Sequence, residues 1–290
     1  MKPSAKLLLL GGTLALLAAV KLFAASPTRD AIHELTADYL ARRPSQSLHA
    51  GMTLAEARPA QKNFVKQLMR TLGRPIGFKV GLISKAAQAA AGTTSPARGV
   101  LLEKMLLPNG AQVSARFGSR PLYEPDLIVV VKDASINDAK TPLDVAKHLR
   151  EIVAFIELPD RIVAESEKVD GSLITAINVG ARLGVLGDRV KVQPTAEFVE
   201  ALEKMVVTAT DEKGTELARA DGKSLMGNPL NVVLWLLRDL AATGEKLKPG
   251  DLLSLGTFAP PKPPTAGQSL TVRYEGLPGG PLKVSARFTP

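Results

Sequence analysis

The feature that most constrains the fold is a change in the residue pattern at residue 77. After this point, short apolar, β-branched segments alternate with Gly and Pro. Runs of this length and composition, bounded by turn residues, are typical of β-strands. The clearest are Leu127–Val131, Ile152–Ile156, Val206–Thr210 and Leu270–Tyr274. The chain from residue 77 onward is therefore predicted to be strand-rich.

Helical spacing is confined mainly to the region before that point. Arg29–Arg43 and Leu54–Leu72 each carry apolar residues three and four positions apart, which predicts two amphipathic helices. Later, Asp211–Gly214 indicates a hairpin turn, and Asn228 opens an apolar helix that runs to Leu240. The predicted class is mixed α/β and β-rich, with an N-terminal helical cap (27–75) and one catalytic body (76–290).

Residues 1–26 have the organisation of an export signal. Lys2 and Lys6 precede the apolar run Leu7–Val20, and small residues follow at 24–26. As a helix this run would span about 21 Å, less than the roughly 30 Å of a bilayer core. A cleaved signal peptide and a periplasmic location are predicted. An uncleaved inner-membrane anchor facing the periplasm stays open, because Lys21 interrupts the flank and Pro27 follows the small residues.

Charge gives little indication of a macromolecular partner. The net charge is +9, three of these charges lie in the N-terminal segment, and no run of five basic residues occurs. This pattern favours a solvated basic surface and argues against nucleic-acid binding. The isolated histidines His33, His49 and His148 are expected at the surface rather than on a metal, and the absence of cysteine excludes disulfides.

The candidate chemistry lies at Glu124-Pro-Asp126, directly before the apolar run Leu127–Val131. In an extended chain, side chains two residues apart point to the same side. Two carboxylates on one face at the start of a buried strand repel unless a cation neutralises them, and an all-oxygen set suits Mg²⁺ or Mn²⁺. Glu157, which follows Ile152–Ile156, is a candidate third ligand. A solvated strand entry is the alternative interpretation.

Several motifs that occur in a fixed order support the interpretation of these acids as metal ligands. They are Gly77-Phe-Lys-Val-Gly-Leu82, Gly99-Val-Leu-Leu102, Glu124-Pro-Asp126, Ile156-Glu-Leu-Pro-Asp-Arg-Ile162, Met226-Gly-Asn-Pro-Leu230 with Trp235, and Pro249-Gly-Asp251. The ordered set resembles the fumarylacetoacetate hydrolase superfamily, in its 2-hydroxypentadienoate (2-keto-4-pentenoate) hydratase and 4-oxalocrotonate decarboxylase branch. The likeness runs from about Met52 to Phe288.

This resemblance implies a fumarylacetoacetate hydrolase-like fold and a divalent metal, Mg²⁺ or Mn²⁺, bound by Glu124, Asp126 and Glu157. The second ligand is shortened here, since the family has Glu where this chain has Asp126. Lys79 matches the family's active-site lysine, and a surface lysine is the alternative. Implied substrate contacts are Lys79, Asn178, Leu255, Gly256 and Thr257. The resemblance also favours a homo-oligomer.

The chain departs from the family pattern at three positions where an acid is expected, namely Ala97, Lys104 and Ile177. The resemblance implies a metal-dependent lyase or hydratase, acting on a 2-oxo or 2-hydroxydienoate acid of the kind met in aromatic catabolism. An acylpyruvate-type C–C hydrolase and a catalytically altered oxo-acid-binding protein are the alternatives. In each case the expected partner is a small oxo acid.

Overall fold

The structure, a computed structural model, describes residues 27–290. The predicted signal peptide or anchor, residues 1–26, lies outside the described residues. Within 27–290, none of the helices combines the length and the apolar character needed to cross a membrane.

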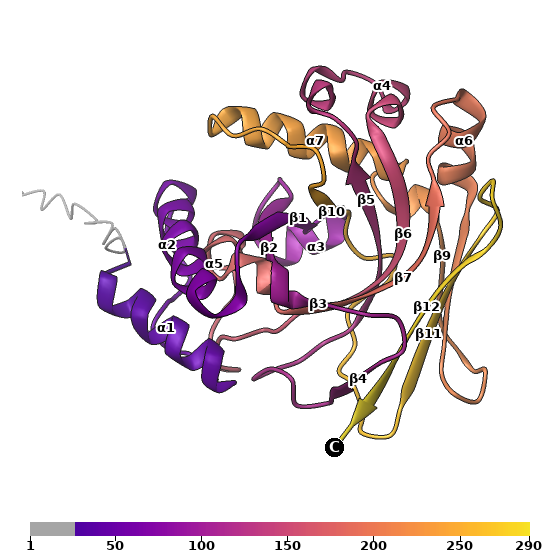
Figure 1. Ribbon diagram of the computed structural model, residues 1–290. Helices are drawn as coiled ribbons and strands as arrows, with labels where there is room; N and C mark the ends of the chain where they lie inside the picture. Colours follow the sequence, from indigo (N-terminus) through magenta and orange to yellow (C-terminus); the bar gives the residue numbers. More distant parts are fainter. Residues whose placement is uncertain (1–26) are drawn as a thin grey trace, which may run out of the picture.

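Seven strands of the described chain form the first sheet (Figure 1). Their order is β2 (Ala97–Leu102), β1 (Pro75–Gly81), β10 (Leu252–Ser254), β5 (Glu124–Val131), β6 (Leu149–Leu158), β7 (Leu183–Lys191) and β3 (Leu106–Leu107). The pairs β1–β10 and β3–β7 are parallel, and the others are antiparallel.

The first sheet brings together strands that lie far apart in the sequence. Gly77 has φ +151°, and a Cβ placed there would lie 1.9 Å from the carbonyl oxygen of Leu252 on β10. Glycine at this position therefore allows β1 to approach β10 closely.

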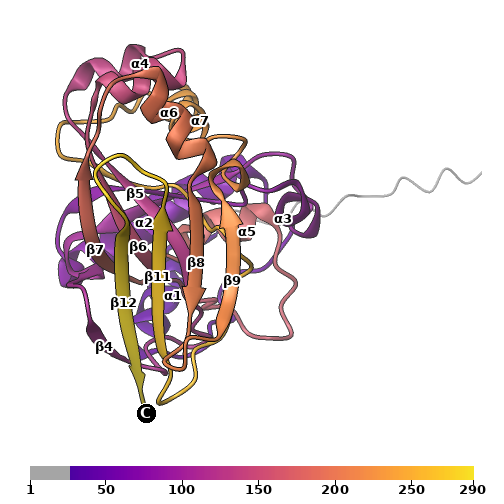
Figure 2. The same ribbon diagram turned by 90° about the vertical axis from the view of Figure 1, so that its right-hand side faces the viewer.

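Five strands of the described chain form the second sheet, which faces the viewer in Figure 2. Their order is β4 (Ala111–Ser114), β12 (Leu282–Thr289), β11 (Ser269–Glu275), β8 (Val206–Thr210) and β9 (Glu216–Asp221). The predicted turn at Asp211–Gly214 joins β8 to β9, and Gly214 N donates to Asp211 O at 3.1 Å. Tyr274 of β11 reaches the first sheet, where its hydroxyl donates to the Phe155 carbonyl at 2.9 Å.

Helices cover the ends and one side of the sheets. They are α1 (Arg29–Ala41), α2 (Leu54–Leu72), α3 (Lys85–Ala90), α4 (Pro142–Lys147), α5 (Gly171–Ala176), α6 (Ala196–Lys204) and α7 (Pro229–Ala242). Short 3₁₀ turns are η1 (Glu103–Met105), η2 (Ala134–Asp138), η3 (Asn178–Gly180) and η4 (Gly222–Ser224). α2 lies against α5 and β2 with α1 packed on it, α4 and α6 lie at the opposite end, and α7 reaches from α4 toward α2 (Figure 1).

The sequence predictions for the helices agree with the structure, with small differences at two C-termini. α7 ends at Ala242, two residues beyond the predicted Leu240. α2 begins and ends where predicted, because Thr53 and Glu56 form a reciprocal cap at its N-terminus. α1 ends two residues before the predicted Arg43. The reason is that Arg42 adopts the left-handed conformation, with φ 57°, and its N–H and that of Arg43 close the last turn.

The core of the described residues is divided into a large cluster between the two sheets, a smaller one under the N-terminal helices, and a third of four residues on β5 and β6. The smaller cluster includes Leu35, Phe64, Leu68, Leu102 and Leu173, so α1 and α2 share apolar contacts with β2 and α5. The predicted division at residue 75 stays a prediction. The mixed α/β class is confirmed.

Candidate active site

Polar residues of the site come from four neighbouring strands of the first sheet. In the register of the strands, Lys79 on β1 pairs with Ser254 on β10, and Glu124 on β5 pairs with Glu157 on β6. Ser254 pairs with Ile128, which lies two residues beyond Asp126. Because paired residues and residues two apart share one face of a sheet, all five polar side chains project to the same side.

Lys79 is buried against this acidic face. Its side chain retains 4% of its exposure, and its ammonium forms an ion pair with Glu157, which retains 3%. The same Nζ donates to the carbonyl oxygen of Val179 at 2.9 Å. The alternative interpretation of Lys79 as a surface lysine is therefore wrong. A Cβ at Gly99 on the adjacent strand would lie 2.9 Å from Lys79 Cγ, so glycine at 99 makes room for this side chain.

Asp126 is fully buried, and protein donors hold both of its oxygens. Oδ1 accepts from the backbone N–H of Gly256 at 2.9 Å and from that of Leu127. Oδ2 accepts from the Ser254 hydroxyl. Burial, and next the charge of Glu157, raise the pKa of Asp126 to about 7, against the lowering effect of these hydrogen bonds.

Glu124 lies opposite Glu157, and fewer hydrogen bonds offset the cost of its negative charge than at Asp126. Burial is the main reason that its pKa rises to about 8, and the negative charge of Glu157 adds to the rise while Lys79 opposes it. Three carboxylates thus share a face with one close ammonium. This excess of buried negative charge is what a hard divalent cation neutralises, so the chemistry of the donor set fits Mg²⁺ or Mn²⁺.

The three carboxylates share the face without converging on one point. Among residues 27–290, no group of three or more acidic, histidine or cysteine side chains is arranged to hold a metal ion. Asp126 is turned toward Ser254 and Gly256, and Glu157 toward Lys79. The assignment of Glu124, Asp126 and Glu157 as ligands stays a prediction, and it requires Glu157 to divide its oxygens between Lys79 and the ion.

A cavity of about 510 Å³ opens over this face. Lys79, Glu124, Glu157 and Thr257 line it, together with Val179. Three further predicted contacts, Asn178, Leu255 and Gly256, lie outside its lining. Leu255 is buried in the large core, and Gly256 gives its N–H to Asp126. A direct substrate contact for these three stays a prediction.

Asn178 holds the backbone turn that carries the Val179 carbonyl. Its side chain accepts from Val100 N at 2.8 Å and from Gln61 Nε2 at 3.2 Å, and donates to Val100 O at 2.9 Å. Asn178 and Val179 both have left-handed φ values, of 57° and 54°. The side-chain bonds stabilise this uncommon turn, which aims the Val179 carbonyl at Lys79.

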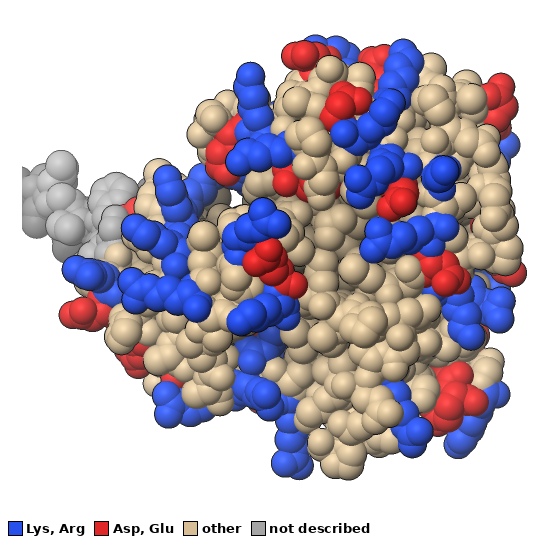
Figure 3. All heavy atoms as spheres, in the orientation of Figure 1, with Lys and Arg blue, Asp and Glu red and all other residues tan. Residues whose placement is uncertain are grey.

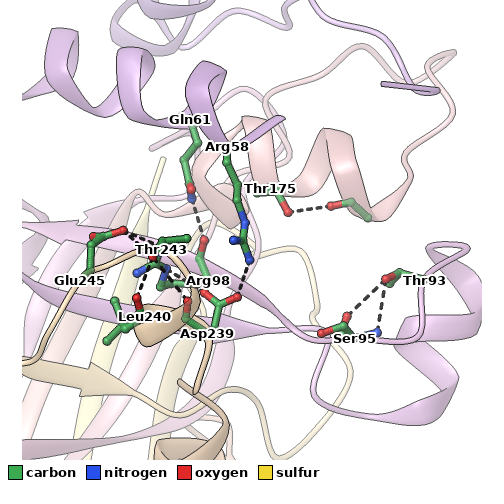
Figure 4. A network of polar contacts seen from close by, with 11 residues as sticks. Arg58, Gln61, Thr93, Ser95, Arg98, Thr175, Asp239, Leu240, Thr243 and Glu245 are labelled. Atoms are coloured by element: carbon green, nitrogen blue, oxygen red, sulfur yellow. Dashed lines mark hydrogen bonds and ion pairs between the residues drawn. The ribbon is translucent and has the colours of Figure 1, made fainter. Parts of the chain in front are cut away.

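Gln61 and Ser254 are two site residues that sequence reasoning missed. Gln61 lies on α2 and is buried, and its amide also donates to Arg98 O at 2.6 Å (Figure 4). Its position on the buried face of an amphipathic helix was a usable signal, since a polar residue there needs a partner. Ser254 ends a strand of three residues, which is too short for a periodic pattern.

A second network of charged residues joins α2, β2 and α7 beside the site. Asp239 on α7 accepts from Arg58 and from Arg98, the latter at 3.1 Å, and Arg98 also reaches Glu245 at 2.9 Å (Figure 4). A small cavity of about 40 Å³ lies here. These pairs place β2 relative to the two helices.

The three positions where the resemblance expects an acid lie in different surroundings. Ala97 lines the 40 Å³ cavity, Lys104 is exposed on η1, and Ile177 lines the 510 Å³ cavity. The histidines lie away from the carboxylate face, where His49 pairs with Glu167 and His148 with Asp133. Lys and Arg side chains are scattered over the face seen in Figure 3, with acidic and neutral side chains between them.

Comparison with known proteins identifies the class to which this geometry corresponds. No protein-family model matches the chain. A solved 4-oxalocrotonate decarboxylase from Pseudomonas putida G7, complexed with magnesium and adipate, superposes with a TM-score of 0.76 at 24% identity, covering 89% of this chain and 96% of that one. A structure from Oleispira antarctica, assigned as a fumarylacetoacetate isomerase/hydrolase, gives a TM-score of 0.50 at 18% identity, with 74% and 94% covered. The chain has the fumarylacetoacetate hydrolase-like fold.

Sequence relatives narrow this class. The TodF product hydratase of Pseudomonas putida is 27% identical over 249 residues, which cover 86% of this chain and 90% of that protein. Other curated relatives are named as 2-keto-4-pentenoate hydratases and 4-oxalocrotonate decarboxylases. The predicted resemblance to this branch is confirmed, and the chain is related to those enzymes.

Proposed function

We propose that the protein is a metal-dependent hydratase, a lyase, that acts on a 2-oxo or 2-hydroxydienoate carboxylic acid. The observation that carries the proposal is one cavity wall on which Lys79, Glu124 and Glu157 meet, with Asp126 behind them. The names of the curated relatives, which are hydratases and decarboxylases, support it.

A divalent metal, Mg²⁺ or Mn²⁺, is part of the proposal. The magnesium complex of the related decarboxylase fold and the excess of buried carboxylates both support it. Glu124 and Glu157, which line the cavity, would bind the ion directly, with Asp126 as the third ligand. When bound, the ion supplies Lewis-acid stabilisation of negative charge on the substrate's oxygen next to the carboxylate.

Lys79 is the proposed catalytic residue of the chain itself. An ammonium has three donors, of which one goes to Val179 O and one to Glu157. The remaining donor is left for a substrate carboxylate, or for moving a proton to or from the carbon chain. The turn that begins at Asn178 and the carboxylate of Glu157 hold this donor in place. Hydration adds water across the carbon–carbon double bond and yields a hydroxylated 2-oxo acid.

The test is an assay of the full chain with Mg²⁺ and 2-hydroxypenta-2,4-dienoate. Turnover is measured as the loss of enol absorbance, and the product is then analysed. Glu124→Ala is expected to abolish it, and Glu200→Ala, at an exposed acid on α6, is the matched control. Turnover that survives EDTA contradicts the proposal. The same assay on acetylpyruvate separates a C–C hydrolase, which releases pyruvate and acetate. Binding without any turnover identifies an oxo-acid-binding protein.

The proposed location is the periplasm, and the support is the sequence pattern of residues 1–26. Cell fractionation of the tagged full chain, with N-terminal sequencing of the periplasmic form, tests it. A chain that stays in the membrane fraction with an intact N-terminus indicates the anchor instead. A homo-oligomer is also proposed on the resemblance, and sedimentation of the purified protein tests that point.

A further inference from the structure

The cavity over the carboxylate face extends well beyond the polar residues. Its volume of about 510 Å³ lies in the range of roughly 300–1,000 Å³ that encloses drug-sized ligands. A five-carbon dienoate is far smaller than such a ligand. Its carboxylate and neighbouring oxygen account for the polar wall, and most of the cavity remains for other atoms.

Many of the other lining residues are apolar and come from elements outside the four strands. α3 contributes Ala87 and Ala90, whose small side chains leave space, and α5 contributes Ile174. Further apolar lining residues are Ile83, Ala91, Leu122, Val163, Val169 and Ile177. These apolar side chains offer no hydrogen bond to a second polar end of a substrate. Ser84, which also lines the cavity, caps α3 by accepting from Ala87 N at 3.1 Å.

Arg161 lines the cavity, is exposed, and its charge acts on Glu124. The other charged side chains of the lining, apart from the site carboxylates and Lys79, are engaged elsewhere or lie in water. Glu165 is 92% exposed, and Arg120 reaches it at 3.9 Å. Glu167 pairs with His49 at 3.0 Å. Asp160 accepts from Arg182 and from the backbone of Ser119 and Arg120. The apolar wall therefore lies between a polar end that binds the oxo-acid group and a hydrated rim.

Ile177 is part of this wall. The resemblance to the hydratase branch implies an acid there, and this chain has a buried branched hydrocarbon, 5% exposed. An acid would disfavour an apolar group beside it, because a carboxylate is costly to separate from water. Isoleucine removes that cost and adds contact area.

We infer that this site takes oxo acids with an unbranched apolar tail, longer than a five-carbon dienoate. The inference rests on the proposed function for the oxo-acid end, and on the cavity alone for the tail. Each methylene that leaves water for an apolar wall strengthens binding by about threefold to fourfold.

The experiment measures Mg²⁺-dependent binding of unreactive saturated 2-oxo acids to the full chain by calorimetry, with 2-oxopentanoate, 2-oxohexanoate, 2-oxooctanoate and 2-oxodecanoate. Between the five- and eight-carbon acids the dissociation constant is expected to fall by about 30- to 60-fold. A flat series, or one that weakens with length, overturns the inference.

Two variants on one helix locate the tail. Ala87 lines the cavity, whereas its neighbour Ala86 is exposed and lies outside the lining. Ala87→Leu is expected to remove most of the gain for the eight-carbon acid and to leave 2-oxopentanoate binding within about twofold. Ala86→Leu is expected to keep the whole series. Equal behaviour of the two variants overturns the placement of the tail.

Turnover is measured separately on the five-carbon dienoate, so that the hydratase function and the tail site can each be contradicted independently. Length-dependent binding without turnover contradicts the proposed hydratase function and leaves the tail site standing. Turnover with a flat binding series contradicts the tail site and leaves the hydratase function standing.

Discussion

Glu124 and Glu157 occupy facing positions of the antiparallel pair β5–β6, and Lys79 on β1, with two strands between, forms an ion pair with Glu157. Two carboxylates in facing positions on a sheet repel each other. In the metal-free chain the repulsion is relieved by the ammonium of Lys79 and by protonation, since the pKa of Glu124 rises to about 8. Binding of a metal ion would therefore favour the ionised form of these carboxylates.

The first prediction concerns pH. The pKa values of Glu124 and Asp126 rise to about 8 and about 7 from ordinary values of 4.5 and 3.8. Between these limits the folded chain holds more protons than the unfolded chain, so its stability falls as pH rises. In EDTA, the melting temperature is expected to drop between pH 6 and pH 8.5, most steeply below pH 7 and levelling off above pH 8.

Added Mg²⁺ gives the control for this pH effect. The ion favours the ionised carboxylates, so it is expected to raise the melting temperature more at pH 8 than at pH 6. Glu124→Gln, which cannot ionise, is expected to flatten the fall in EDTA. A melting temperature that rises from pH 6 to 8.5 in EDTA contradicts the prediction.

The second prediction concerns Lys79. Lys79→Met removes the ammonium and leaves Glu157 buried without its partner, which is expected to destabilise the metal-free chain by about 3–5 kcal/mol. Urea unfolding in EDTA measures the loss. The double variant Lys79→Met, Glu157→Gln is expected to recover part of it. If the loss of stability in the double variant equals the sum of the losses in the two single variants, the broken ion pair is not the cause of the destabilisation.

The third prediction concerns Ser254, whose hydroxyl bonds to Asp126 and favours its ionised form. Ser254→Ala removes a bond that orients a proposed ligand, and loss of such outer partners weakens metal binding by about 10- to 100-fold. Calorimetric titration with Mg²⁺ or Mn²⁺ at pH 7 measures the change. Ser269→Ala, on β11 away from the carboxylates, is the matched control. Unchanged affinity in Ser254→Ala argues against Asp126 as a ligand.

Local patterns were sufficient to predict much of this structure. The capped, amphipathic helix α2 was predicted to the residue, and so was β8, because both are long enough to show their own periodicity and end at turn or capping residues. The short strand β10 was not predicted. Its three residues acquire their role only by pairing with β1 on one side and β5 on the other.

The site follows the same division between local and long-range information. The spacing of Glu124 and Asp126 on one strand was readable, and the register of β5 and β6 brings Glu157 opposite Glu124. The burial of Lys79 was not readable, since it depends on Glu157 and on the Val179 carbonyl, which distant segments supply. Asn178 was predicted to contact substrate, which stays a prediction, and its role in holding a backbone turn was not readable.

The last prediction tests that turn through Gln61, which touches no carboxylate of the site. Its amide donates to Asn178 Oδ1 and to Arg98 O, so Gln61→Ala leaves two buried acceptors with one partner fewer. A stability loss of about 1–3 kcal/mol is expected. Because Asn178 sets the Val179 carbonyl that orients Lys79, turnover is expected to fall by about 10- to 100-fold, while Mg²⁺ affinity stays within twofold. Asn63→Ala, two residues along the same helix at an exposed position, is the matched control and is expected to change neither quantity. If Gln61→Ala lowers stability and leaves turnover intact, then Gln61 serves the fold alone, and the turn at Asn178 holds Lys79 without help from α2.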